Sequence, residues 1–105
     1  MDDPRPVRTC TSLEEVRAEI DRLDAALIAL LAERAAYVGQ AAGFKRTEAE
    51  ARSPARVEAV IGRVRERAEA AGLPPEVAER TWRAMIAAFI ELEVAQVAQV
   101  DQVSR

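Results

Sequence analysis

The chain has 105 residues, half of them apolar and 31% charged, and its formal net charge is −3. This length predicts one domain, and the balance of apolar and charged residues is that of a folded globular protein. The lack of histidine and the single cysteine, Cys10, exclude Ser-His-Asp catalysis, histidine-ligated zinc and an internal disulfide within this chain.

The first segments in chain order are a polar arm and the start of a helix. Residues 1–11 contain two prolines and several charges, and we expect a flexible arm followed by one all-α domain over residues 12–105. The all-α class is favoured because alanine supplies 22 residues while glycine, proline and aromatic residues are few. Ser12 and Glu15 form a capping-box pattern, which predicts that the first helix begins there.

An apolar seam runs along this first helix. Its residues recur at alternating spacings of three and four, and they are Leu13, Val16, Ile20, Leu23, Leu27 and Leu30. The phase continues through Arg34 and Phe44, so we expect one helix from Leu13 to about Lys45, roughly 50 Å long. A globule of this chain length would be only about 33 Å across. We therefore expect a second copy to cover the seam, in an intertwined homodimer.

Two further helices are predicted after the first. Ser53 and Pro54 indicate an N-cap and a first-turn proline, and Gly72 indicates the end of this shorter helix. Pro74 and Pro75 begin the third helix, whose apolar side comprises Ala78, Trp82, Met85, Ile86, Phe89, Ile90 and Val97. The predicted order is thus a long, a shorter and a long helix.

Two charged residues fall within the apolar stripes. Arg34 either reaches solvent, pairs with an internal glutamate, or binds an anionic ligand, because a buried guanidinium needs a partner. Lys45 follows 11 residues later on nearly the same helical face, about 16 Å along the axis, so the two side chains would bracket a small dianion.

Glu93 either pairs with an internal arginine or is held in its neutral form, which can donate a hydrogen bond. Arg17 lies on a different face; alone it is a solvated charge, and only in an antiparallel dimer would it reach its partner's pocket.

These residues carry a resemblance to a known family. Residues 13–21, residues 30–34 and the run to Lys45 resemble the all-helical AroQ-class chorismate mutases, and they are also similar to the isochorismate-pyruvate lyases. The resemblance covers roughly residues 10–97, and the spacing of Arg17, Arg34 and Lys45 is fairly specific. It implies a three-helix chain in an entwined dimer with two identical sites, each borrowing one arginine across the interface.

The resemblance also implies a role for each site residue. Arg34 and Lys45 match the contacts to the substrate carboxylate and the ether oxygen. Arg17 matches the arginine donated by the partner subunit, and Arg56 the basic residue at the start of the second helix. Glu93 stands where the family has a glutamine or glutamate that forms a hydrogen bond with the ether oxygen. The apolar residues that would line the pocket beside it are Ile86, Phe89 and Ile90.

Some residues leave the branch of the family open. Ser53 and Val57 occupy places where many bacterial mutases carry acidic residues, and the short connection after Lys45 resembles the lyases, whereas Glu93 replaces the lyase glutamine. The predicted function is chorismate mutase, with isochorismate-pyruvate lyase as the alternative. A dimeric helical interaction module without enzymatic activity is the second alternative.

The expected partners follow from the same features. We expect a small-molecule substrate, chorismate or isochorismate, and a second copy of the chain, with no cofactor and no metal. The net charge of −3 disfavours nucleic acid. No apolar run reaches the length of a membrane span, and residues 1–10 do not resemble a signal peptide, so a cytoplasmic location is predicted.

Overall fold

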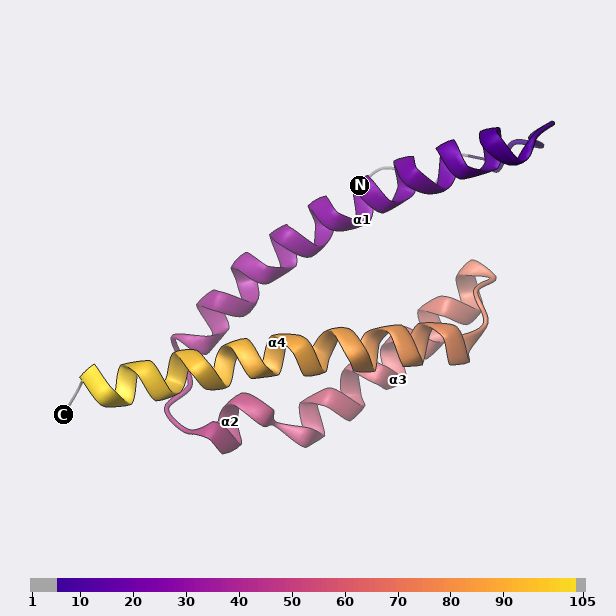
Figure 1. The fold of residues 1–105 in the computed structure, drawn as a ribbon. Helices are drawn as coiled ribbons and strands as arrows, with labels where there is room; N and C mark the ends of the chain where they lie inside the picture. Colours follow the sequence, from indigo (N-terminus) through magenta and orange to yellow (C-terminus); the bar gives the residue numbers. More distant parts are fainter. Residues whose placement is uncertain (1–5, 104–105) are drawn as a thin grey trace. The chain divides into compact units, whose positions relative to one another are not determined.

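The computed structural model describes residues 6–103, and over this range it contains helices and no strand (Figure 1). The helices are α1 (Leu13–Ala42), α2 (Glu48–Arg52), α3 (Pro54–Ala71) and α4 (Pro75–Val103). The predicted all-α class and the order of long, shorter and long helices are confirmed, and the five-residue α2 is an addition to them. The contacts divide the chain into two units, one ending at Arg34 and one beginning at Ala35, which are described separately. Residues 1–5 of the predicted arm lie outside the described residues.

The beginning of α1 is fixed by hydrogen bonds of its first turn. The backbone N–H of Glu15 donates to Ser12 Oγ at 3.1 Å, as the capping-box pattern predicts. The Glu15 carboxylate in turn accepts from the backbone N–H of Thr11 at 2.8 Å. Arg8 lies 3.8 Å from the same carboxylate. Acidic side chains here also interact favourably with the positive end of the helix dipole.

The apolar seam of α1 lies largely open in the N-terminal unit. Its side chains are between 40% and 61% exposed, and they are Leu13, Val16, Ile20, Leu23, Leu27 and Leu30. The hydrophobic effect opposes leaving so many large aliphatic groups in water. None of the described helices, α1 included, combines the length and the apolar character that crossing a bilayer requires.

The end of α1 differs from the prediction, because the helix stops at Ala42 and Lys45 lies beyond it. The backbone N–H groups of Gly43, Phe44 and Lys45 each donate to the carbonyl three residues earlier, at 3.0–3.1 Å, which tightens the chain into a turn. Thr47 is then extended, and its hydroxyl accepts from the Glu50 N–H at 3.1 Å to begin α2. The spacing of Thr47 and Glu50 repeats that of Ser12 and Glu15, which is a local signal for the start of a new helix. The first helix therefore ends before Thr47, although the apolar spacing continues through Phe44.

The boundaries of α3 confirm part of the prediction. Pro54 occupies the first turn, and Gly72 ends the helix in the left-handed conformation at φ 80°, with the Leu73 N–H donating to the Ala68 carbonyl at 2.8 Å. Ser53 makes no side-chain cap, against the prediction. This one residue both closes α2 and opens α3, at φ 28° and ψ 71°, and it cannot adopt the extended backbone that a capping side chain needs.

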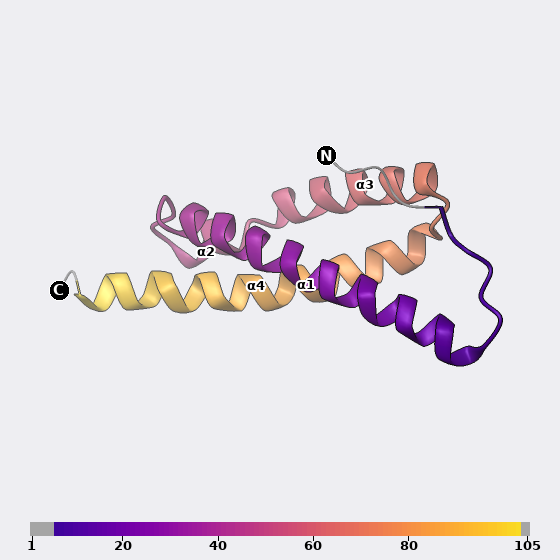
Figure 2. The same cartoon turned by 90° about the horizontal axis from the view of Figure 1, so that it is seen from above.

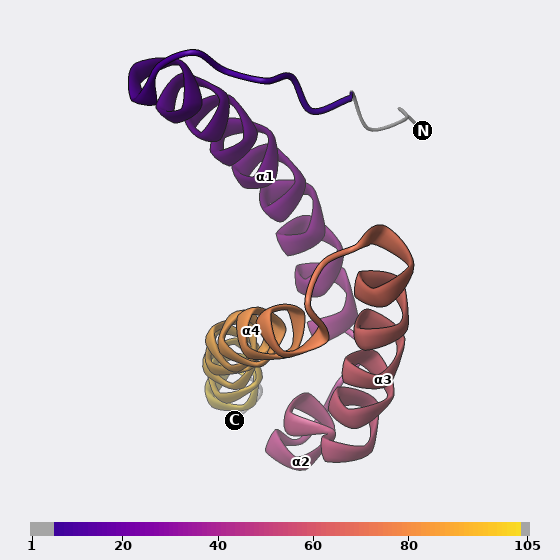
Figure 3. The ribbon, with the colours of Figure 1, turned by 90° about the vertical axis from the view of Figure 1, so that its right-hand side faces the viewer.

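In the C-terminal unit α3 and α4 lie side by side, joined by residues 72–74 (Figures 2 and 3). The core between them consists of Val64, Ala68 and Ala78, with Val60 and Trp82 packed against it. Small alanine side chains let the helix axes approach closely and leave the larger residues to fill the gap. The short helix α2 also packs against α4.

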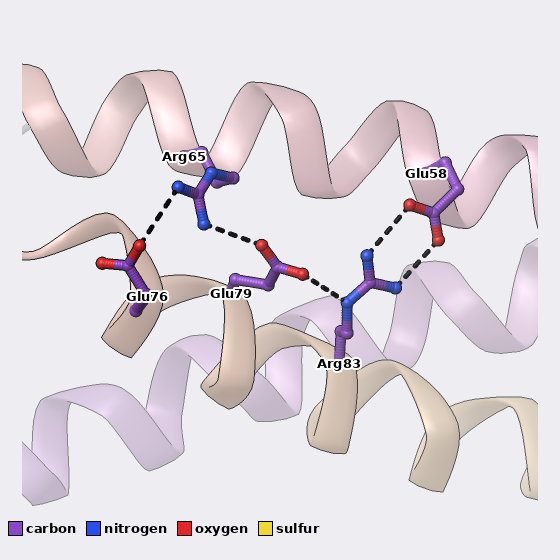
Figure 4. A network of polar contacts seen from close by, with 5 residues as sticks. All are labelled: Glu58, Arg65, Glu76, Glu79 and Arg83. Atoms are coloured by element: carbon purple, nitrogen blue, oxygen red, sulfur yellow. Dashed lines mark hydrogen bonds and ion pairs between the residues drawn. The ribbon is translucent and has the colours of Figure 1, made fainter.

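A network of ion pairs lies along one side of α3 and α4, which together form a helical hairpin (Figure 4). Arg83 of α4 binds the Glu58 carboxylate of α3 with two nitrogens, at 2.8 and 2.9 Å, and Glu79 at 2.7 Å. Arg65 of α3 binds Glu79 at 2.7 Å and Glu76 at 3.5 Å. The hydrogen bonds from Arg83 lower the pKa of Glu58 and, together with those from Arg65, that of Glu79. These contacts bind α3 and α4 in a fixed register, although ion pairs that are exposed or only partly buried are weak singly.

Candidate functional site

The candidate site is built around an ion pair between Lys45 and Glu93. Glu93 is the single charged side chain that is buried among the residues whose burial is described, with 7% of it exposed. The Lys45 ammonium donates a hydrogen bond to Glu93 Oε2. A carboxylate removed from water on an apolar helix face needs such a partner. Of the alternatives for Glu93, an internal ion pair fits this contact, with lysine in place of the expected arginine.

The two members of the pair come from distant parts of the sequence. Lys45 lies in the connection between α1 and α2, and Glu93 lies on α4, 48 residues later. The predicted separation of Arg34 and Lys45 along one helix therefore does not hold, because the helix ends before Lys45. The backbone N–H of Lys45 donates to the Ala42 carbonyl at 3.1 Å, which ties the residue to the end of α1.

An apolar helix face adjoins the pair. Ile86 is buried and Phe89 and Ile90 are half-buried, and with Glu93 they occupy one side of α4 at helical spacing. Apolar surroundings lower the local dielectric constant and strengthen the field of the ammonium. The structure thus brings Lys45 to the helix face that holds Glu93 and the predicted lining residues.

Comparisons with known proteins place these residues in a family. The family model of chorismate mutase type II matches residues 16–94, the greater part of the chain. The chain belongs to the chorismate mutase type II family. It is also similar to an isochorismate pyruvate lyase of Pseudomonas aeruginosa, with 33% identity over 85 residues, which cover 81% of this chain and 84% of that protein. The family resemblance predicted from the sequence is confirmed.

The other basic residues predicted for the chorismate mutase site lie on two helices. Arg17 is exposed and Arg34 is half-buried on α1, within the N-terminal unit. Arg56 is exposed in the first turn of α3, within the C-terminal unit. Their roles at the site stay predictions.

The contact between α2 and α4, close to Lys45, was not predicted from the sequence. Helix α2 follows Lys45 directly, and its last residue, Arg52, contacts Glu48 at 2.9 Å and Glu91 of α4 at 3.3 Å. The hydrogen bond to Glu48 is the main cause that raises the pKa of Arg52. The Thr47 and Glu50 spacing was the available signal for α2, but nothing local in the sequence indicates that Arg52 meets α4.

Proposed function

We propose that this chain is a chorismate mutase, which converts chorismate to prephenate by a Claisen rearrangement within one molecule. The observation that carries the proposal is the Lys45 ammonium held at the buried Glu93, beside the apolar face of α4. In this reaction the C–O bond of the ether breaks while a C–C bond forms, and negative charge accumulates on the ether oxygen. A cation fixed in partly dehydrated surroundings stabilises that charge more strongly than water does. The rearrangement itself passes no proton or electron to the protein, which suits a chain without histidine.

The substrate's two carboxylates require cationic partners. Guanidinium groups bind carboxylates in a bidentate manner and fix their orientation. We assign this task to Arg34 and to Arg17 of the partner subunit, with Arg56 as a further cation at the start of α3. The apolar side chains of α4 hold the ring in the folded conformer that the reaction needs, which lowers the entropic part of the barrier.

Glu93 acts on the same oxygen as Lys45. As a carboxylate it orients the Lys45 ammonium. A glutamine, which the resemblance also places at this position, would donate a second hydrogen bond to the ether oxygen. The isosteric variant Glu93→Gln keeps an acceptor for Lys45 and a donor for the substrate, so we expect it to retain far more turnover than Glu93→Ala.

An intertwined homodimer completes this proposal. The exposed seam of α1 supports it, because side chains such as Leu23 and Leu27 are still 49% and 55% exposed, and covering that exposed half gains roughly half of the about 1.5–3 kcal/mol of a full burial. Antiparallel pairing of two α1 helices would cover the seam and carry Arg17 of the partner subunit to the other site. The cytoplasm stays the predicted compartment.

The proposal is tested by adding chorismate to the purified protein and following the loss of its ultraviolet absorbance, with prephenate identified by chromatography. We expect turnover above the uncatalysed rate that disappears in Lys45→Ala. Turnover of chorismate at the background rate in the wild-type protein would overturn the proposal.

The similarity to the lyase of Pseudomonas aeruginosa supports a second candidate function. An isochorismate-pyruvate lyase breaks the same C–O bond but transfers a hydrogen from the ring to the leaving pyruvate, which yields salicylate. Isochorismate is therefore assayed in parallel, with salicylate fluorescence as the signal. Faster turnover of isochorismate than of chorismate would assign the lyase activity, and no turnover of either would favour a helical interaction module.

A further inference from the structure

The position of the Lys45 ammonium is not set by a helix. Residues 43–47 lie between α1 and α2, and a lysine side chain is long and flexible. A charge that stabilises a transition state must already be in place before the reaction, because a shift of about 1 Å can lower the rate by up to about a hundredfold. The segment that carries Lys45 therefore needs a fixed attachment.

Helix α2 supplies the local part of that attachment. Five residues are too few for a helix to be stable alone, so its contacts must hold it. The Arg46 backbone N–H donates to Glu50 at 3.1 Å, and the Arg46 guanidinium donates to the Gly43 carbonyl at 2.9 Å. These two hydrogen bonds on Arg46 link the turn before Lys45 to helix α2 after it, so that residues 43–50 form one folded segment.

The contact with α4 supplies the remaining part. Ala51, only 3% exposed, is the buried residue of α2, which packs against α4. Beside it Arg52 pairs with Glu91 at 3.3 Å. Glu91 precedes Glu93 by two residues. The segment from Lys45 to Arg52 therefore contacts the same turn of α4 through two ion pairs, one at each of its ends.

We propose that Arg52 is a positioning residue, whose ion pair with Glu91 holds α2 against α4 and thereby keeps the Lys45 ammonium at Glu93. The inference rests on the proposed function, because it concerns the same site. Arg52 and Glu91 do not touch the substrate; they act through Lys45. An exposed ion pair contributes little to overall stability, so its loss is expected to change turnover while the unfolding temperature stays nearly constant.

The test exchanges the two charges. Arg52→Glu and Glu91→Arg each place like charges opposite one another, and we expect each to lower kcat about 5- to 20-fold with a much smaller change in KM. The double variant R52E/E91R, made together with Glu48→Gln to remove the repulsion that Glu48 would exert on the new carboxylate, restores the attraction to α4 and is expected to recover kcat to within about threefold of wild type. Arg65→Glu, which breaks the ion pairs of Arg65 with Glu76 and Glu79 between α3 and α4, is the control and should leave kcat unchanged.

A second measurement separates this inference from the proposed function. Lysine side-chain NMR follows the Lys45 ammonium directly, and we expect its signals to move and broaden in Arg52→Glu but not in Arg65→Glu. Unchanged Lys45 signals and unchanged kcat in Arg52→Glu, or a double variant that does not recover, would overturn the positioning role. A wild-type protein that turns over neither substrate would overturn the proposed function alone, and the NMR result would still decide the role of Arg52.

Discussion

The seam of α1 and the contact between α3 and α4 are apolar stripes with the same helical periodicity, but their surroundings differ. Residues 72–74 return the chain immediately, so α3 and α4 cover one another around Val64, Ala68 and Ala78. In the N-terminal unit the seam of α1 stays exposed along its length. Periodicity thus shows which face must be buried, whereas the connection between helices decides whether the same chain can bury it.

The charged residues of the two regions also differ in whether they are paired with another helix of the same chain. On the hairpin, Arg65 and Arg83 are bound to carboxylates of the neighbouring helix. On α1, Arg17, one of the two basic residues of this helix predicted for the site, is exposed and would act only in a second copy. The cations Arg65 and Arg83 are therefore paired within one chain, whereas the N-terminal unit is the part that the proposed homodimer would cover. The following variants test this division.

The largest effect is expected from a charge in the seam. Leu27→Glu places a carboxylate in the proposed dimer interface, where an unpaired buried charge is too costly to keep. We expect a monomer with no measurable turnover, because Arg17 of the partner subunit is then absent from each site. Light scattering after size exclusion gives the mass. Ala25→Glu, on the opposite side of α1, is the control and should remain dimeric; a dimeric, active Leu27→Glu would refute the interface.

Removal of the Lys45 ammonium is expected to have the next largest effect. Lys45→Ala should lower kcat about 10²- to 10³-fold, the usual loss for one preorganised group that stabilises developing charge. Circular dichroism should show unchanged helix content, since Lys45 lies outside the helices. Near-normal turnover would remove Lys45 from the mechanism.

Mixing two inactive variants tests whether the site is shared. Arg17→Ala and Lys45→Ala lose different residues, and in a mixed dimer one of the two sites regains both. Random exchange of subunits makes half of the dimers mixed, so we expect about a quarter of wild-type turnover to return. A site formed within one chain would give no recovery on mixing.

A smaller effect is expected for two isoleucines, one from each region. Ile61 of α3 is 3% exposed, and Ile28 of α1, which lies off the seam, is 65% exposed. We expect Ile61→Ala to lower the free energy of unfolding by about 2–5 kcal/mol, because it leaves a cavity. Ile28→Ala should change it by less than about 0.5 kcal/mol. Urea denaturation measures both, and equal losses would contradict the difference in packing.

The smallest effect concerns the ion pairs of the hairpin. The pKa values of Glu58 and Glu79 are lowered in the folded chain, so the stability they contribute is present above their unfolded values near 4.5 and is lost as the pH falls through the folded values. Arg83→Gln removes the first cause of both shifts. We expect its unfolding temperature to fall less between pH 7 and pH 3 than that of the wild type. An identical slope in both proteins would show that Arg83 makes no contribution.

The sequence by itself determined the helical class, several helix boundaries and the family. Ser12, Pro54 and Gly72 act through their own hydrogen bonds or backbone angles, which depend only on neighbouring residues, so their signals could be read locally. The spacing of Arg17, Arg34 and Lys45 carried the resemblance that the family match confirms. The one local signal missed was Thr47 with Glu50, because the apolar phase of α1 continues past the point where the helix ends.

Only the tertiary structure decided what the charged residues meet. That Lys45 pairs with Glu93, and Arg52 with Glu91, follows from the packing of α2 against α4, which joins residues about 40 to 50 positions apart. Periodicity places Glu93 on an apolar face but cannot select its partner, because every internal cation satisfies the same local rule. The partner is chosen by which backbone segments lie together, and that depends on the whole set of helix contacts rather than on the residues beside Glu93.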